Sequence, residues 1–144
     1  MKRVSAYRLG AYDSQKDDSE SMLIGFFKSA EKCREVIERY KKLPGFDRPS
    51  CTFVTKEYSF EAEETFQLNN VYFLSHEWED SLYYHTTDIG VYLNEEEAIQ
   101  EQNRLISSEK EEDKYFRMYP ECFTIDNYEI DKEHWTYGFN TEPW

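Results

Sequence analysis

The chain has 144 residues, with 17 Lys and Arg against 30 Asp and Glu, so its formal net charge is −13. Aromatic residues make up 17% of the chain, whereas it contains only 5 Gly and 4 Pro. This composition excludes collagen-like, linker-like and low-complexity chains, and it provides enough apolar surface for a folded core. The negative charge disfavours binding to nucleic-acid phosphates and to anionic membranes, both of which attract basic proteins.

The first half of the sequence predicts two strands, a helix and a third strand. Short runs rich in aromatic and β-branched residues over residues 4–12, 22–27 and 52–60 are typical of strands. Ser29 is placed to cap a helix whose apolar residues repeat at helical spacing: Cys33, Val36, Ile37, Tyr40 and Leu43. Pro44 and Gly45 follow, and they predict the end of that helix.

The second half predicts the same order of elements. Strands are expected over residues 71–78, 88–93 and 122–130, because these runs have the same β-type composition. Asn94 precedes Glu95, Glu96 and Glu97, which favours a capped helix N-terminus with carboxylates in its first turn. The end of this helix is expected near residues 110–114.

The two halves also resemble each other in detail. Residues 24–27 (IGFF) and 89–92 (IGVY) stand 65 positions apart, and each run precedes a helix cap. Gly25 and Gly90 occupy corresponding positions in the two halves. A glycine within a strand is typical of a β-bulge or of a close approach of another segment. We therefore expect two tandem ββαβ units, at residues 1–68 and 69–144. The predicted fold class is α+β, a two-layer sandwich with a mainly antiparallel sheet and two helices on one face.

Three cysteines, Cys33, Cys51 and Cys122, form an odd and widely spaced set without a C-x-x-C pair. Such usage favours free thiols in a reducing compartment. No apolar run approaches the ~20 residues of a spanning helix, and no apolar stretch follows the basic N-terminus. A cytoplasmic location without a secretory signal is therefore expected.

The second half carries further motifs: residues 89–92, Pro120, Phe123, Tyr128 and the run WTYGF at residues 135–139. With these motifs it resembles a small uncharacterised bacterial domain family that ends in a W-T-x-G-F signature. Many members also carry L-P-G-F after the helix, which here occurs only in the first half, at residues 43–46. The first half has Thr65 and Phe66 where the tryptophan signature would stand. The resemblance implies a short ββαβ module and no established activity.

The charge is concentrated in the second half. Residues 69–144 hold 5 Lys and Arg against 18 Asp and Glu, a net −13, whereas residues 1–68 are balanced. The densest cluster of chemically active side chains runs from His76 to His85, and aromatic residues there favour an interface. A second aromatic group lies near the C-terminus. The predicted partner-binding residues are Glu77, Trp78, Glu79, Asp80, Tyr83, Tyr84, Trp135 and Tyr137.

These observations favour a non-enzymatic, acidic protein-binding module, such as an inhibitor or immunity-type protein for a basic partner. No catalytic residues, metal or cofactor are predicted, because the chain has no P-loop, G-x-G-x-x-G or G-x-S-x-G motif. Two alternatives stay open. One is a small enzyme that uses His76, His85 and nearby carboxylates, which could also hold zinc in principle. The other is a regulatory homodimer that pairs a free sheet edge.

Overall fold

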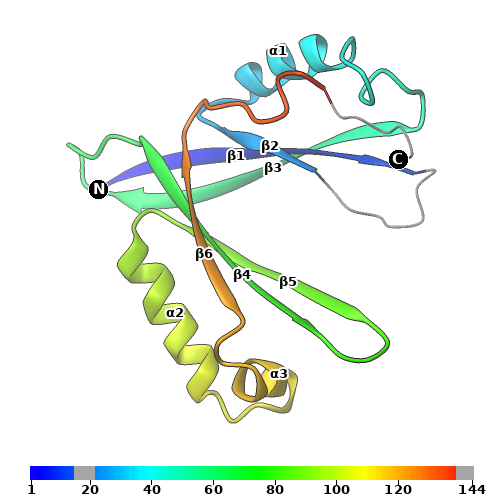
Figure 1. The fold of residues 1–144 in the computed structure, drawn as a ribbon. Helices are drawn as coiled ribbons and strands as arrows, with labels where there is room; N and C mark the ends of the chain where they lie inside the picture. Colours follow the sequence, from blue (N-terminus) through cyan, green and yellow to red (C-terminus); the bar gives the residue numbers. More distant parts are fainter. Residues whose placement is uncertain (15–21, 139–144) are drawn as a thin grey trace. The chain divides into compact units, whose positions relative to one another are not determined.

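A computed structural model describes residues 1–14 and 22–138 (Figure 1). These residues form two compact units, each with a three-stranded antiparallel sheet. Unit 1 comprises Met1–Asn69 and the chain from Glu129 onward, and unit 2 comprises Asn70–Tyr128. The α+β class predicted from the sequence is confirmed, and most of the regular structure is strand.

Unit 1 is built from β1 (Lys2–Asp13), β2 (Met22–Phe27), α1 (Ala30–Tyr40) and β3 (Cys51–Ala62). Its strand order is β2-β1-β3. The Ser29 side chain accepts a hydrogen bond from the Lys32 N–H at 3.0 Å, so the predicted helix cap is confirmed. The apolar face of α1 packs on the sheet and forms a core with these residues: Leu9, Ala11, Ile24, Phe27, Cys33, Val36, Tyr40 and Phe46.

Unit 2 is built from β4 (Asn70–Glu79), β5 (Tyr84–Tyr92), α2 (Glu95–Ser107), a 3₁₀ turn (Glu111–Asp113), α3 (Lys114–Met118) and β6 (Phe123–Glu129). Its strand order is β5-β4-β6, which matches the order in unit 1. Asn94 caps α2 by accepting a hydrogen bond from the Glu97 N–H at 2.9 Å, as predicted. The short helix α3 was not predicted.

The pairing register of the first two strands is the same in both units. Leu9 pairs with Gly25, and Leu74 pairs with Gly90, 65 positions further along the chain. In each unit the register shifts immediately after this leucine, which leaves Ile24 or Ile89 in the irregular position. The expectation that the two glycines mark a bulge or a close approach is therefore confirmed.

The sequence predicts a two-layer arrangement with one mainly antiparallel sheet, and the described strands form two separate three-stranded sheets. The return segment, residues 130–138, follows β6, and its first part, up to Trp135, runs along the outer edge of β2 (Figure 1). Ile130 forms a parallel bridge with Phe26, and the N–H groups of Asp131 and His134 donate to the carbonyls of Phe26 and Ile24, each at 2.8 Å. The return segment thus covers an otherwise open edge.

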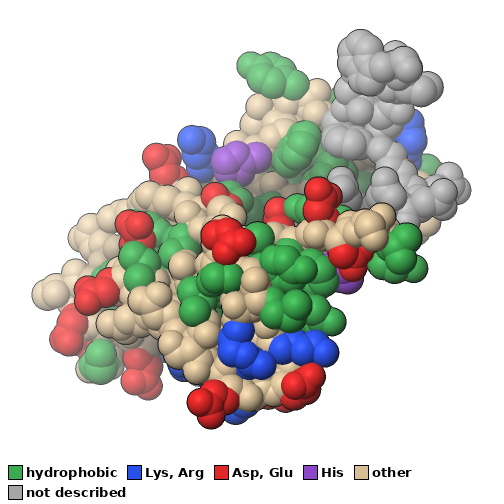
Figure 2. Space-filling view, turned by 60° about the horizontal axis from the view of Figure 1, so that its bottom comes forward, with side chains coloured by type: hydrophobic (Ala, Val, Ile, Leu, Met, Phe, Trp, Pro, Cys, Tyr) green, Lys and Arg blue, Asp and Glu red, His purple; other side chains and the backbone are tan. Residues whose placement is uncertain are grey.

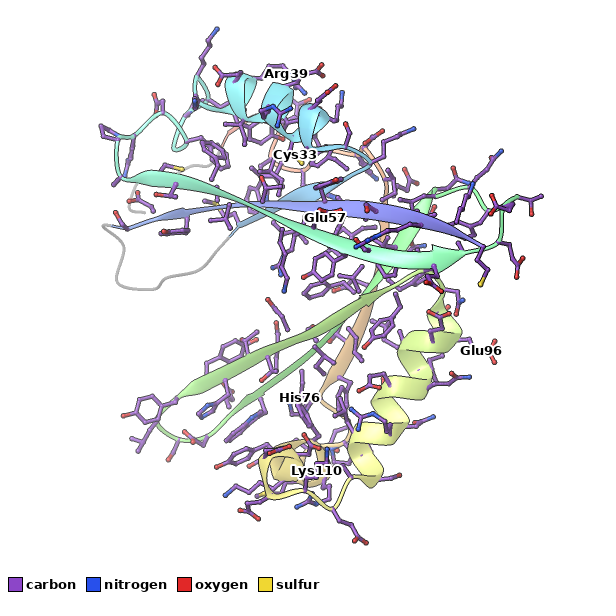
Figure 3. The ribbon with its side chains drawn as sticks, turned by 180° about the vertical axis from the view of Figure 1, so that it is seen from behind. Cys33, Arg39, Glu57, His76, Glu96 and Lys110 are labelled. Carbon is purple, nitrogen blue, oxygen red and sulfur yellow. The ribbon has the colours of Figure 1, made fainter. Side chains whose placement is uncertain are left out.

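Side-chain contacts fix the return segment against α1. The Arg39 guanidinium donates two hydrogen bonds to the Glu133 carboxylate, at 2.8 and 2.7 Å. The Tyr40 hydroxyl donates to the carbonyl of His134. Figure 3 shows Arg39 on α1, with Cys33 of the same helix toward the sheet. The described part of the run that begins at Trp135 therefore belongs to unit 1, although it follows the last strand of unit 2.

Candidate functional site

The hairpin of β4 and β5 ends in a tight turn that displays three large side chains. Leu82, Tyr83 and Tyr84 are 79%, 66% and 62% exposed. The Asp80 carboxylate accepts hydrogen bonds from the N–H groups of Leu82 at 2.8 Å and Tyr83 at 2.7 Å. These N–H groups, with a further contribution from His85, hold the pKa of Asp80 below its usual range. The ionised carboxylate therefore fixes the turn that presents the exposed residues.

An aromatic stack lies beside this turn and is centred on Trp78. The His85 ring lies across the strand pair with its centroid 4.0 Å from that of Trp78, at an interplanar angle of 13°. From α3 and the residue after it, Tyr115 and Tyr119 stack on Trp78 at 4.8 and 4.6 Å. Trp78 stays half-buried, and Tyr115 is exposed. The stack makes the end of the hairpin a broad and rigid aromatic surface.

Carboxylates line the same end of the hairpin. Glu77, Glu79 and Asp80 are exposed, and the Tyr84 hydroxyl donates a hydrogen bond to Glu77. This hydrogen bond raises the pKa of Tyr84, so its hydroxyl stays protonated. Figure 2 shows hydrophobic side chains at the surface with acidic side chains next to them. We call this surface the hairpin patch: Glu77, Trp78, Glu79, Asp80, Leu82, Tyr83 and Tyr84.

His76 has a different role from His85. It is 1% exposed, its Nε2 lies 2.9 Å from the Tyr119 carbonyl, and its ring packs against Phe116 and Phe123. Figure 3 shows His76 on the side of the sheet where α3 lies. These contacts hold the end of α3 against the sheet and thereby position Tyr119. Within residues 1–14 and 22–138, no group of three or more His, Cys, Asp or Glu could hold a metal ion.

The eight predicted contact residues are divided between the two units. Six of them lie in the hairpin patch, whereas Trp135 and Tyr137 lie in the return segment on unit 1. The Trp135 indole N–H donates to the Leu23 carbonyl at 3.1 Å, and Tyr137 is 95% exposed. Phe139, the last residue of the tryptophan signature, lies outside the described residues. The prediction missed Leu82, Tyr115 and Tyr119, although the spacing of Tyr115, Met118 and Tyr119 is typical of one helix face.

The thiols of Cys33 and Cys51 offer little nucleophilic character. Burial raises the pKa of Cys33 to about 11, and burial also raises the pKa of Cys51. All three cysteines are free. Cys33 belongs to the core of unit 1, so we assign it a packing role.

The fold and the hairpin patch define an α+β protein made of two ββαβ units, one of which presents an acidic and aromatic hairpin. Residues 69–139 match DUF7336, a domain of unknown function. The match spans unit 2 together with the return segment. No curated protein and no solved structure matches the sequence. In the part of the chain that the structure describes, no helix is long and apolar enough to cross a membrane.

Proposed function

We propose that this chain is a non-enzymatic protein-binding module that contacts its partner through the hairpin patch. One observation carries the proposal: Leu82, Tyr83 and Tyr84 are largely exposed at a turn that is fixed by Asp80 and supported by the Trp78 stack. Large apolar side chains that are exposed together on a rigid frame are typical of interfaces. Such a frame loses little conformational entropy on binding.

The charge around the patch supports a basic partner. Glu77, Glu79 and Asp80 flank the exposed aromatic residues, and residues 69–144 carry a net −13. Carboxylates at the rim of an interface accelerate the encounter with a basic protein and select against acidic surfaces. An inhibitor or immunity-type protein that neutralises a basic protein in the cytoplasm fits this chemistry. Nucleic acids and anionic membranes do not fit it.

We further infer that the two units are diverged tandem copies. The shared strand order, the glycine pairings at Leu9 and Leu74, and the helix caps Ser29 and Asn94 support this inference, because the pairings and the caps each recur at an offset of 65. The acidic excess occurs in only one copy. We therefore assign partner contact to unit 2 and a supporting role to unit 1.

The enzyme alternative receives less support from the described side chains. His76 packs between aromatic rings and contacts a backbone carbonyl, and His85 stacks on Trp78 with Asp80 3.3 Å from its Nε2. Both histidines therefore have packing partners that account for their positions. The homodimer alternative depends on an open sheet edge, and light scattering over a concentration series tests it.

The proposal is tested by capture from a lysate of the source cells with the tagged chain, at low and at high salt, with quantitative mass spectrometry. The variant E77K/E79K/D80K is compared with the wild type. We expect a basic protein that the wild type retains at low salt, and that both high salt and the variant release.

A matched control carries the same charge change on unit 1. The variant E61K/E63K/E64K alters three exposed carboxylates and shifts the net charge by the same amount. Retention of the basic protein by this control would assign binding to the hairpin patch. Equal loss in both variants would show that net charge alone attracts the protein, and it would contradict the proposal.

A further inference from the structure

Unit 1 and unit 2 differ at one sheet edge. The outer edge of β2 is covered by the return segment, whereas β5, its counterpart, is a terminal strand of its sheet. Burial follows this difference. Ile24 and Gly25 are buried, but Ile89 and Gly90, at the corresponding positions of unit 2, are only partly buried. Residues 1–14 and 22–138 contain two such edges and a single return segment, which covers the edge of β2.

We propose that the outer edge of β5 is a second binding site, which takes an extended segment of a partner chain with the side-chain pattern of the return segment. The pattern is an apolar residue, a glutamate three positions later and a tryptophan two positions after that, as in Ile130, Glu133 and Trp135. The segment adds to the sheet by backbone hydrogen bonds, and its side chains give specificity. This site is separate from the hairpin patch and does not depend on the function proposed above.

The backbone of β5 offers the acceptors that such a segment needs. In unit 1 the return segment donates to the carbonyls of Ile24 and Phe26. The equivalent carbonyls belong to Ile89 and Val91, because the strand pairing of the two units agrees at an offset of 65. The local backbone geometry is therefore already formed in unit 2.

The glycine next to these carbonyls explains how a segment can approach. A Cβ atom at Gly25 would lie 2.4 Å from the carbonyl oxygen of Lys132, so the return segment requires a glycine there. Gly90 keeps the same opening in β5. The three atoms nearest to a Cβ at Gly90 all belong to the outer end of the Tyr92 side chain, with the hydroxyl oxygen at 2.9 Å. The fold of unit 2 therefore tolerates a methyl group at a position where a bound segment would not.

The arginine that binds the glutamate of the pattern has a counterpart in α2. Arg39, which holds Glu133 in unit 1, corresponds to Arg104. In unit 2 the Arg104 guanidinium bonds to Glu101, with Nε–O distances of 3.0 and 2.9 Å, and it remains half-exposed. Glu101 thus pairs with the Arg104 guanidinium, and the glutamate of an incoming segment replaces Glu101 as its partner. The first half of the chain has Thr65 where the tryptophan would stand, so it offers no such segment of its own.

The test uses a fluorescein-labelled peptide with the sequence of residues 129–139 and the full-length chain, followed by fluorescence anisotropy. We expect saturable binding to the wild type and loss of binding to Gly90→Ala. Arg104→Ala should weaken binding by about fivefold, the upper range for a partly exposed ion pair. Glu101→Gln should strengthen it, because the competing carboxylate is removed.

Gly90→Ala and Arg104→Ala distinguish this site from the edge of β2 in unit 1, and two further controls test the side-chain pattern and the hairpin patch. A peptide with Ala in place of Glu133 and Trp135 should not bind, and the chain variant L82S/Y83S should bind like the wild type. If Gly90→Ala fails to fold, the opposite effects of Arg104→Ala and Glu101→Gln decide the question. Absence of binding to the wild type, or binding that is unchanged in Gly90→Ala and Arg104→Ala, would overturn the proposal.

Discussion

The two units have the same strand order, but their helices bury different numbers of side chains against the sheet. Helix α1 buries Cys33, Val36 and Tyr40, whereas α2 buries only Ala98 and Leu105. The position of Val36 corresponds to Glu101 in α2, where a carboxylate replaces an apolar side chain. Unit 1 therefore has the larger apolar core, and its covered edge adds to this core. In unit 2 the three most exposed of the large apolar side chains, Leu82, Tyr83 and Tyr84, lie at the hairpin patch.

The same strand order is thus compatible with a covered sheet edge in one unit and an uncovered edge in the other. A sheet edge and an exposed aromatic group are liabilities in a stable unit, because they favour association. In unit 1 the return segment removes that liability at β2. In unit 2 the same strand stays at the end of its sheet, and we assign contact functions to this unit.

The largest expected difference in stability is between alanine substitutions of the two isoleucines at the irregular strand positions. Ile24 is completely buried in the core of unit 1, and the return segment bonds to its carbonyl, whereas Ile89 is only partly buried. We expect Ile24→Ala to lower the free energy of unfolding by about 3 kcal/mol, and Ile89→Ala by about 1 kcal/mol. Urea denaturation followed by tryptophan fluorescence measures both values. Equal losses would show that the two edges are equally covered.

The paired glycines sharpen the comparison. Gly25→Ala should destabilise the chain by about 2 kcal/mol, because the new methyl group collides with the Lys132 carbonyl and displaces the return segment. Gly90→Ala should cost less than about 1 kcal/mol, since only the Tyr92 ring must move. Thermal unfolding by calorimetry compares the two variants. A larger loss for Gly90→Ala would contradict the assignment.

Tyr40 isolates one hydrogen bond of the return segment. Tyr40→Phe removes the hydroxyl that donates to the His134 carbonyl, and we expect a loss of about 1 kcal/mol. Tyr137→Phe serves as a control, because Tyr137 is almost fully exposed and its hydroxyl should contribute nothing measurable. Urea denaturation at neutral pH provides the comparison, and indistinguishable variants would contradict the role of Tyr40.

The same tyrosine predicts a pH dependence. Burial, with the nearby Glu133 carboxylate, raises the pKa of Tyr40 to about 12. Because the pKa is raised in the folded state, Tyr40 contributes fully to the free energy of unfolding below the pKa of the unfolded state, near 10. This contribution is lost as the pH rises through about 12. The stability difference between the wild type and Tyr40→Phe should therefore shrink over this range. A constant difference would contradict the burial of this phenol.

The smallest effect concerns Asp80 and the turn of the hairpin. The pKa of Asp80 is lowered in the folded state. Its carboxylate therefore stabilises the turn at pH values above the pKa of the unfolded state, and this stabilisation is lost as the pH falls through the pKa of the folded state. The amide signals of Leu82 and Tyr83 should shift together in that acidic range in NMR spectra. Asp80→Asn should abolish the titration. Shifts that instead centre on the ordinary aspartate value, about 4, would contradict the anchoring of the turn.

Much of the fold could be predicted from the sequence because its signals are local. Ser29 and Asn94 are followed by helical patterns, and Gly25 and Gly90 stand in equal β-rich runs. Helix α3 was missed because it has only five residues, and charged residues precede it. The place of the return segment could not be predicted, since Glu133 and Arg39 lie 94 positions apart. A pairing over such a distance depends on which sheet edge the chain reaches.

The candidate site was predicted in part for the same reason. The cluster of Glu77, Trp78 and Tyr83 is local, and one hairpin brings it together. The support that Tyr115 and Tyr119 give to Trp78 comes from a separate element, so it required the structure. His76 was proposed as a reactive group, yet its contacts are those of a packing residue. The sequence of a strand does not show which residues from other elements pack against a histidine in it.

The most direct test of the central claim is hydrogen–deuterium exchange of the full chain, alone and with the protein that it captures. We predict slower exchange upon binding in residues 77–85 and 115–119, which contain the hairpin patch and the stack, with unit 1 unchanged. Slower exchange confined to α1 or β3, with residues 77–85 unchanged, would contradict the assignment of partner contact to unit 2.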